Sequence, residues 1–203
     1  MNVVTSIGII LILLIFLYFL GLNIKDNNPN IVAKVGISTS LCLILGIVDS
    51  YIPSPLAGAK LGLANIMILI CLYQYGFKIT FFIDLSRVIL LSIFKGNLLG
   101  MGNMMSLVGA LISFLIMAIL VKLARNKISI IVISMLGSLG FNLGQILVGY
   151  IYLGNIGILY YLPILETIGL FSGIFIGILS KTILRYLSPL KGALKNEQRK
   201  RNY

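Results

Sequence analysis

The chain is built from apolar stretches of about 20 residues separated by short polar loops, and each stretch is long enough to cross a bilayer as a helix. Since 59% of the 203 residues are hydrophobic and only 10% are charged, a soluble domain is excluded. We therefore predict an all-α fold, a polytopic membrane helix bundle. The expected spans are residues 3–22, 31–52, 61–75, 77–94, 104–123, 128–153 and 158–186.

One polar stretch, residues 49–66, separates the second span from the third. Its prolines and glycines interrupt any continuous helix, because proline lacks an N–H and glycine permits tight turns. An acid (Asp49), a base (Lys60) and an amide (Asn65) lie in this stretch beside apolar helices. Irregular polar backbone at a membrane is tolerated where it lines a cavity or is buried in protein. The stretch is our first candidate for a ligand site, and an ordinary connecting loop is the alternative.

The same stretch carries a family resemblance. Pro53 followed by Gly-Ala-Lys-Leu-Gly-Leu-Ala-Asn-Ile at 58–66 resembles the signature of the heptaprenyl diphosphate synthase component I family, also called the Gx transporter family. Further matches follow in the same order over about residues 31–188, and two departures are Asp49 where the family usually has Glu and Phe141 where it has His. The further matches are Arg87 with Gly96, Ser106 with Gly109, and Asn142-Leu-Gly-Gln145.

The resemblance implies an organisation and a partner. The family is similar to the substrate-binding S components of energy-coupling-factor transporters, which implies a six-helix core over 31–188. Residues 1–30 would then be an extra N-terminal transmembrane helix with its loop, and 189–203 a basic cytoplasmic tail. In S components a small-residue face docks a coupling membrane subunit that works with ABC ATPases. Gly36 and Ser40 are the matching candidates here.

The positive charges predict the topology. The net charge is +11, and the bases gather in the loop 122–127 and in the tail after Lys181. Such clusters mark the cytoplasmic side and favour anionic lipid, so no nucleic-acid partner is expected. The C-terminus is then cytoplasmic in the cell membrane. Counting spans backwards places the 53–60 loop and the N-terminus outside.

Charged groups inside the spans are costly and are therefore candidates for function. Asp84 and Arg87 are three residues apart on one helix and can form an ion pair. Alternatively, Arg87 faces an anionic ligand while Asp84 orients it, and both roles are compatible. Asn142 and Gln145, also three apart, lie in the outer half of their helix, and Glu166 lies in the outer half of the next. The predicted ligand-binding residues are Asp49, Lys60, Asn65, Arg87, Asn142, Gln145 and Glu166.

Glycines recur at four-residue intervals in the last two spans. Small residues with this spacing allow close helix–helix approach in lipid. We expect Gly140, Gly144, Gly169, Gly173 and Gly177 to lie in packing seams.

Several chemistries are missing from the sequence. It contains no paired aspartates of the DDxxD type for a magnesium diphosphate, no P-loop and no histidine, so no catalytic residue, metal site or cofactor is predicted. Two functions remain open. One is a membrane subunit that binds a small solute at its outer face and depends on a separate ATPase. The other is a non-catalytic membrane subunit of a polyprenyl or quinone pathway.

Overall fold

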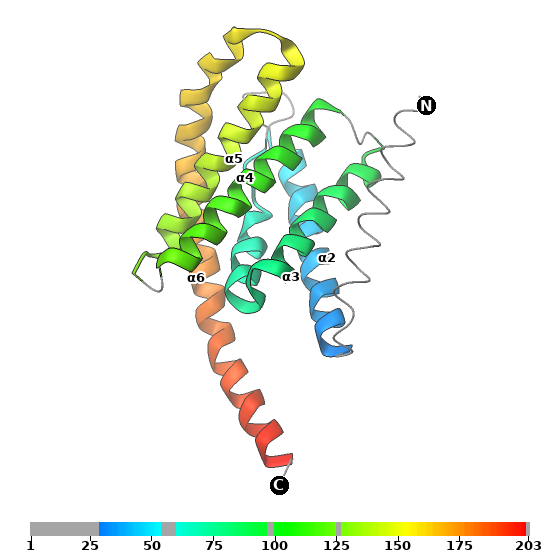
Figure 1. Cartoon of the computed structure of the whole chain (residues 1–203), viewed down its shortest axis with the longest axis vertical. Coiled ribbons are helices and arrows are strands. Elements are labelled where there is room, and N and C mark those ends of the chain that lie inside the picture. The colour runs from blue at the N-terminus through cyan, green and yellow to red at the C-terminus, as the bar shows by residue number, and fades with distance from the viewer. Residues whose placement is uncertain (1–28, 54–59, 97–99, 125–126, 202–203) are drawn as a thin grey trace.

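The computed structural model describes residues 29–53, 60–96, 100–124 and 127–201. Within these ranges the chain forms five long α-helices and one short 3-10 helix (Figure 1). The predicted span 3–22 lies outside the described residues, so the total of seven spans stays a prediction. The helices are α2 (Pro29–Tyr51), α3 (Asn65–Phe94), α4 (Met101–Ala124), α5 (Ile130–Leu153), η1 (Ile156–Tyr161) and α6 (Leu162–Arg201).

Helix α3 reverses direction at Gly76. This residue has φ 77° and ψ −173°, which is not helical and which glycine adopts without a steric penalty. A straight helix would separate Asn65 from Arg87 by about 33 Å, yet Arg87 Nη2 lies 3.5 Å from Asn65 Oδ1. The two arms of α3, residues 65–75 and 77–94, therefore lie against each other (Figure 1). The reversal agrees with the two segments predicted on either side of Gly76.

The first arm of α3 is too short to cross a membrane alone. Its 65–75 range covers about 16 Å at 1.5 Å per residue, roughly half of the hydrocarbon thickness. The sequence analysis expects this helix to begin at residue 61, but the structure begins it at Asn65. The chain before Asn65 is therefore non-helical backbone, and we name residues 60–64 the 60–64 segment.

The described helices make this a multi-pass membrane protein. All five α-helices contain a window long and apolar enough to cross a bilayer. Large apolar side chains are exposed along their outward faces, among them Ile37, Leu147 and Phe175. In water such a surface would be unstable, whereas in a bilayer it contacts acyl chains.

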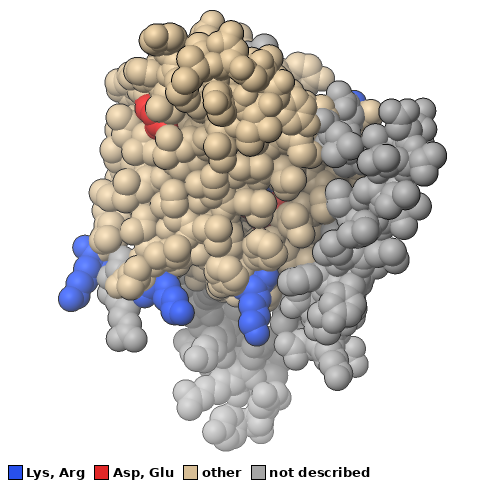
Figure 2. Space-filling model, turned by 45° about the horizontal axis from the view of Figure 1, so that its top comes forward, with Lys and Arg blue, Asp and Glu red and all other residues tan. Residues whose placement is uncertain are grey.

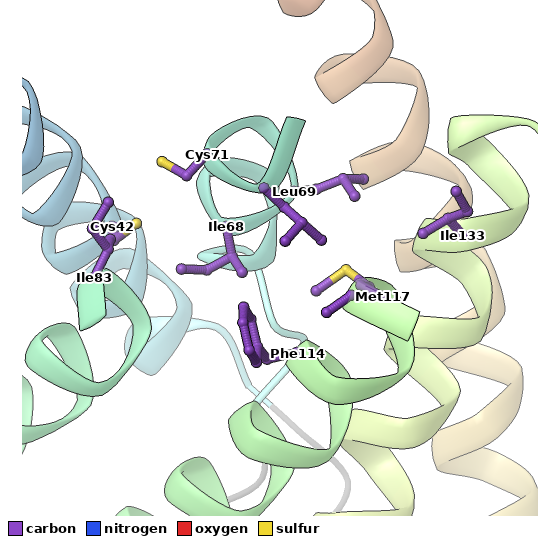
Figure 3. Packing of buried hydrophobic residues seen from close by; sticks show 10 residues of the cluster. Cys42, Ile68, Leu69, Cys71, Ile83, Phe114, Met117 and Ile133 are labelled. Atoms are coloured by element: carbon purple, nitrogen blue, oxygen red, sulfur yellow. The ribbon is translucent and has the colours of Figure 1, made fainter. Parts of the chain in front are cut away.

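The largest apolar cluster joins four helices. Cys42 of α2 packs with Ile68 and Leu69 of the first arm of α3, and Phe114 of α4 lies beneath them (Figure 3). Phe114 is fully buried, and its ring centroid is 5.1 Å from that of Phe77. This cluster holds the short arm of α3 between α2 and α4, just beyond the 60–64 segment.

Glycines set the contacts of α5 with its neighbours. A Cβ added at Gly144 would lie 2.7 Å from Gly109 Cα on α4. On α6, a Cβ at Gly173 would lie 2.7 Å from Met135 Cα, and one at Gly177 would lie 2.6 Å from Ile131 Cα. The backbones of α4, α5 and α6 thus approach as closely as glycine alone allows. Gly140 also packs on α4, against Ile116.

We expect Gly144→Ala to destabilise the protein by about 1–3 kcal/mol, because the new methyl group would meet backbone atoms that cannot rotate away. Gly36→Ala on α2 is the matched control, since a Cβ added at Gly36 would have no atom within 4 Å. Its effect should stay within about 1 kcal/mol. Melting temperatures in detergent measure both variants. Equal losses in the two would contradict a tight α4–α5 seam.

Candidate functional site

The 60–64 segment lies at the centre of the buried polar groups. Gly62 has φ 84°, and a Cβ there would lie 3.0 Å from Asn65 Nδ2. A side chain at this position would be strained as well as crowded. The carbonyl of Gly62 accepts the N–H of Asn65 at 2.9 Å, which makes a turn into the first arm of α3.

Asp49 of α2 accepts hydrogen bonds from three successive backbone N–H groups of this segment. Its two carboxylate oxygens lie 3.1, 2.9 and 3.3 Å from the nitrogens of Leu61, Gly62 and Leu63. The Asp49 side chain is only 2% exposed. Successive N–H groups ahead of a helix form a site for an anion. Here the protein's own carboxylate fills it and ties α2 to the segment.

Gln145 of α5 binds the other side of the segment through its side-chain amide. The backbone N–H of Lys60 donates to Gln145 Oε1 at 2.7 Å, and Gln145 Nε2 donates to the Lys60 carbonyl at 2.9 Å. Gln145 is 1% exposed. The side-chain amide thus makes the two hydrogen bonds that a neighbouring β-strand would make to the backbone of Lys60.

The Lys60 side chain points into the protein. Its Nζ donates to Ser106 Oγ of α4 at 3.0 Å, and the residue is 8% exposed. Burial, the largest cause, together with Lys95 and Arg87 lowers the pKa of Lys60 to about 8, although Asp49 acts in the opposite direction. Burial disfavours the ammonium form because it removes hydration. Partial loss of hydration likewise lowers the pKa of Lys95, which follows the second arm of α3.

Asn65 connects the segment to the ion pair predicted on α3. Arg87 Nε lies 2.7 Å from Asp84 Oδ1, and both residues are at least 95% buried. Asn65 Nδ2 donates to Ser113 Oγ of α4 at 3.2 Å. Two of the predicted site residues thus neutralise each other, and Asn65 links them to the segment.

Asn142 and Glu166 lie apart from this group, and the hydrogen bond of Asn142 places it in the seam between α5 and α6. Asn142 Nδ2 donates to the Leu165 carbonyl at 2.6 Å, and it contacts Gly169. Both carboxylate oxygens of Glu166 are buried without a hydrogen-bond partner among the described residues. These two predicted residues therefore have no contact that joins them to the 60–64 segment in the described part of the chain.

Four serines complete the site, and the sequence analysis assigns no site role to them. Ser172 Oγ of α6 donates to the Leu61 carbonyl at 3.0 Å, and Ser180 Oγ donates to the Ile66 carbonyl at 3.3 Å. Ser106 and Ser113 of α4 instead accept hydrogen bonds from the side chains of Lys60 and Asn65. A signal was present in their spacing, since residues seven or eight apart share one face of a helix.

Phe141 occupies the position where the resemblance expects histidine. A Cβ at Gly62 would lie 3.5 Å from its ring, and Phe141 itself is 1% exposed. The ring packs with Val88 and Ala110. The side of the segment that faces Phe141 is therefore apolar.

Comparison with known proteins identifies the family. The model of the family described as heptaprenyl diphosphate synthase component I matches residues 39–183, which is most of the chain. The protein belongs to this family of membrane proteins. The match includes the whole 60–64 segment and the parts of the helices that contact it. No curated protein and no solved structure matches the chain.

Proposed function

We propose that this protein is an integral membrane subunit that binds a small solute at its outer face, in the manner of an energy-coupling-factor S component. One observation carries the proposal. Side chains of α2, α4, α5 and α6 converge on the 60–64 segment, and Asn65 adds the Asp84–Arg87 pair of α3. Polar and charged groups are costly inside a membrane protein and usually serve function. A purely structural anchor would need none of them.

The orientation that we propose follows from the exposed bases. Apart from Lys95, the exposed Lys and Arg of the described residues gather at one end of the bundle, where α4 meets α5 and where the second half of α6 emerges (Figure 2). That end is assigned to the cytoplasm because basic loops stay inside. The 60–64 segment lies toward the opposite end, where α2 ends, and so faces outside. When the two arms of α3 count as two passes, the described helices make six passes. With the predicted span 3–22 the total is seven, which leaves the N-terminus outside.

Cysteine labelling in intact cells tests this orientation. Tyr160→Cys in η1, where the native side chain is 83% exposed, should react with an impermeant maleimide. Lys127→Cys between α4 and α5 should react only after the cells are opened. The parent protein is a clean background, because Cys42 and Cys71 are both buried. Labelling of Lys127→Cys alone in intact cells would reverse the orientation and remove the outer-face site.

The partner that we propose is a coupling membrane subunit with its ABC ATPases. Gly36 and Ser40 are exposed on α2, and Ser40 Oγ donates to the Gly36 carbonyl at 2.9 Å. That bond satisfies the Ser40 hydroxyl within the helix, so both residues on this face are small and neither needs a polar partner. Such a face suits close contact with a helix of another subunit.

A second function is favoured by the family description, which names a synthase component. In that case the protein would be a non-catalytic subunit that anchors or presents a soluble prenyl-transferring enzyme. The buried polar site would then be structural. This function predicts a stable complex with a soluble protein and no bound solute.

One purification separates the two functions. The protein is extracted from membranes in mild detergent, and mass spectrometry identifies both small molecules and proteins that remain with it. A solute in near-stoichiometric amount, with membrane and ATPase subunits as protein partners, supports the proposal. A prenyl synthase subunit without a solute supports the alternative and contradicts the proposal.

A further inference from the structure

We infer that the solute is an oxyanion and that Lys60 supplies the positive charge that binds it. The inference rests on the proposed function and names the class of solute for the same site. It follows from the charges around the 60–64 segment, from the neutral partner of the Lys60 ammonium, and from a second lysine beside the end of α2.

Positive charge is in excess around the segment. Among the described residues, the acids near it are Asp49 and Asp84, and the bases are Lys60, Arg87 and Lys95. Asp84 is committed to Arg87 at 2.7 Å. Asp49 is committed to three backbone N–H groups. The two carboxylates are therefore already occupied, and within the described part of the chain the two lysines are left without an ion-pair partner.

Lys60 shows this most clearly. Its ammonium donates to the neutral hydroxyl of Ser106, and among the described residues no carboxylate lies within the 4.0 Å of an ion pair. The stretches 54–59 and 97–99, which the structure does not describe, contain no acid at all. A buried cation with only a neutral partner is costly unless an anion completes its surroundings. A bound oxyanion would supply that partner.

Lys95 marks the approach to Lys60. It is exposed, and its Nζ donates to Ser50 Oγ at 2.7 Å, beside Asp49 at the end of α2. Lys95 is close enough to lower the pKa of Lys60. An anion entering from the end of α2 would meet Lys95 first and Lys60 deeper in the protein. Two cations placed one after the other along the same path raise the local concentration of anions.

The pH dependence of binding follows from the same residue. An anion stabilises the protonated form of Lys60, whose pKa without ligand is about 8. Below this pKa the ammonium is present and binding is strong. Above it, affinity should fall toward about tenfold per pH unit. The charged groups around Lys60 are Asp49, which accepts three backbone N–H groups, Asp84 and Arg87, which pair with each other, and the exposed Lys95.

Thermal shifts with defined anions test the inference. The purified full-length chain in detergent is titrated with sodium sulfate and, separately, with sodium succinate, against sodium chloride at equal ionic strength. Both anions keep their charge between pH 7 and 10. We expect sulfate, succinate or both to raise the melting temperature by several degrees at pH 7 and by much less at pH 9.5. A response to sulfate alone indicates a phosphate-like solute, and a response to succinate alone a carboxylate.

Three variants locate the effect. Lys60→Gln should abolish the rise in melting temperature that the anion causes. Lys60→Arg should keep this rise at both pH values, because guanidinium does not titrate there. Lys78→Gln, a control at an exposed base, should behave as the parent protein does. An unchanged shift in Lys60→Gln, or no shift in the parent, overturns the inference. If Lys60→Gln does not fold, the pH-independent shift of Lys60→Arg decides instead.

Failure of the inference is distinct from failure of the proposed function. A neutral or cationic solute found with the purified protein would refute the oxyanion and keep the solute-binding function. A prenyl synthase partner without solute, and without any anion shift, would refute both. An anion shift that depends on Lys60 supports the inference even where no solute survives purification.

Discussion

Replacing Asp49 by alanine should lower the free energy of unfolding by at least about 3 kcal/mol. The reason is the number of groups that depend on it. Three backbone N–H groups donate to Asp49, and each buried donor left unsatisfied costs about 1–3 kcal/mol. Water can reach Leu61 and Leu63 in part, since both are half-buried, so the total should fall below the maximum. The melting temperature and the amount of protein in the membrane measure the effect.

Two further variants make this prediction specific. Asp49→Asn keeps one acceptor oxygen and should lose about half as much stability. Ser50→Ala, at the next position, removes bonds to the Gly46 carbonyl and from Lys95, which are outside the segment, and should cost less than about 1 kcal/mol. If Asp49→Ala melts at the same temperature as Ser50→Ala, the carboxylate does not hold the 60–64 segment.

Removing Arg87 alone should damage the protein more than removing Arg87 and Asp84 together. Asp84 is 2% exposed, and Arg87→Ala would leave its charge buried without a partner, at a cost of about 3–5 kcal/mol. The double variant removes both charges and keeps only the smaller cost of lost packing and of the contact from Arg87 to Asn65. Melting temperatures of Arg87→Ala, Asp84→Ala and the double variant form a complete cycle. A double variant as unstable as the two single losses added together would mean that the pair is not coupled.

The helices themselves were predictable, because the signals that define them, a long apolar stretch and the residues that cap its ends, are local in the sequence. The predicted span 31–52 compares with Pro29–Tyr51, and 128–153 with Ile130–Leu153. Ser129 caps α5 at its start, where its hydroxyl accepts the N–H of Ile131 at 3.3 Å, and Gly154 ends it with φ 60°. Each of these signals lies within a few residues of the boundary that it sets.

The non-helical start of the third predicted span was not predictable in the same way. Leu-Gly-Leu-Ala at 61–64 has no local feature that forbids a helix apart from Gly62. It is kept non-helical by Asp49, which lies twelve to fourteen residues before Leu61 and Leu63, and by Gln145, which binds the preceding Lys60 from 85 residues later. Such partners are tertiary, so local propensity does not reveal them.

A simple physical rule selects the candidate site residues from the sequence, but it does not give their pairings. Polar groups inside apolar spans are few, so Asp49, Asn65 and Gln145 stand out in the sequence. The rule does not say which groups meet. It places Asn142 at the same depth as the others, yet the structure directs its amide to the Leu165 carbonyl in the α5–α6 seam. Depth follows from counting residues, whereas direction depends on helix rotation.

Native mass spectrometry of the intact protein released from detergent shows whether the groups around the 60–64 segment bind a solute. The parent protein and Lys78→Gln should each carry a small-molecule adduct of the same mass in a large fraction of ions. Gln145→Leu, which removes both bonds to Lys60, should lose the adduct by at least about tenfold, since 1.4 kcal/mol suffices for that factor. A parent protein without any adduct, or an adduct that Gln145→Leu retains fully while folded, would contradict the account.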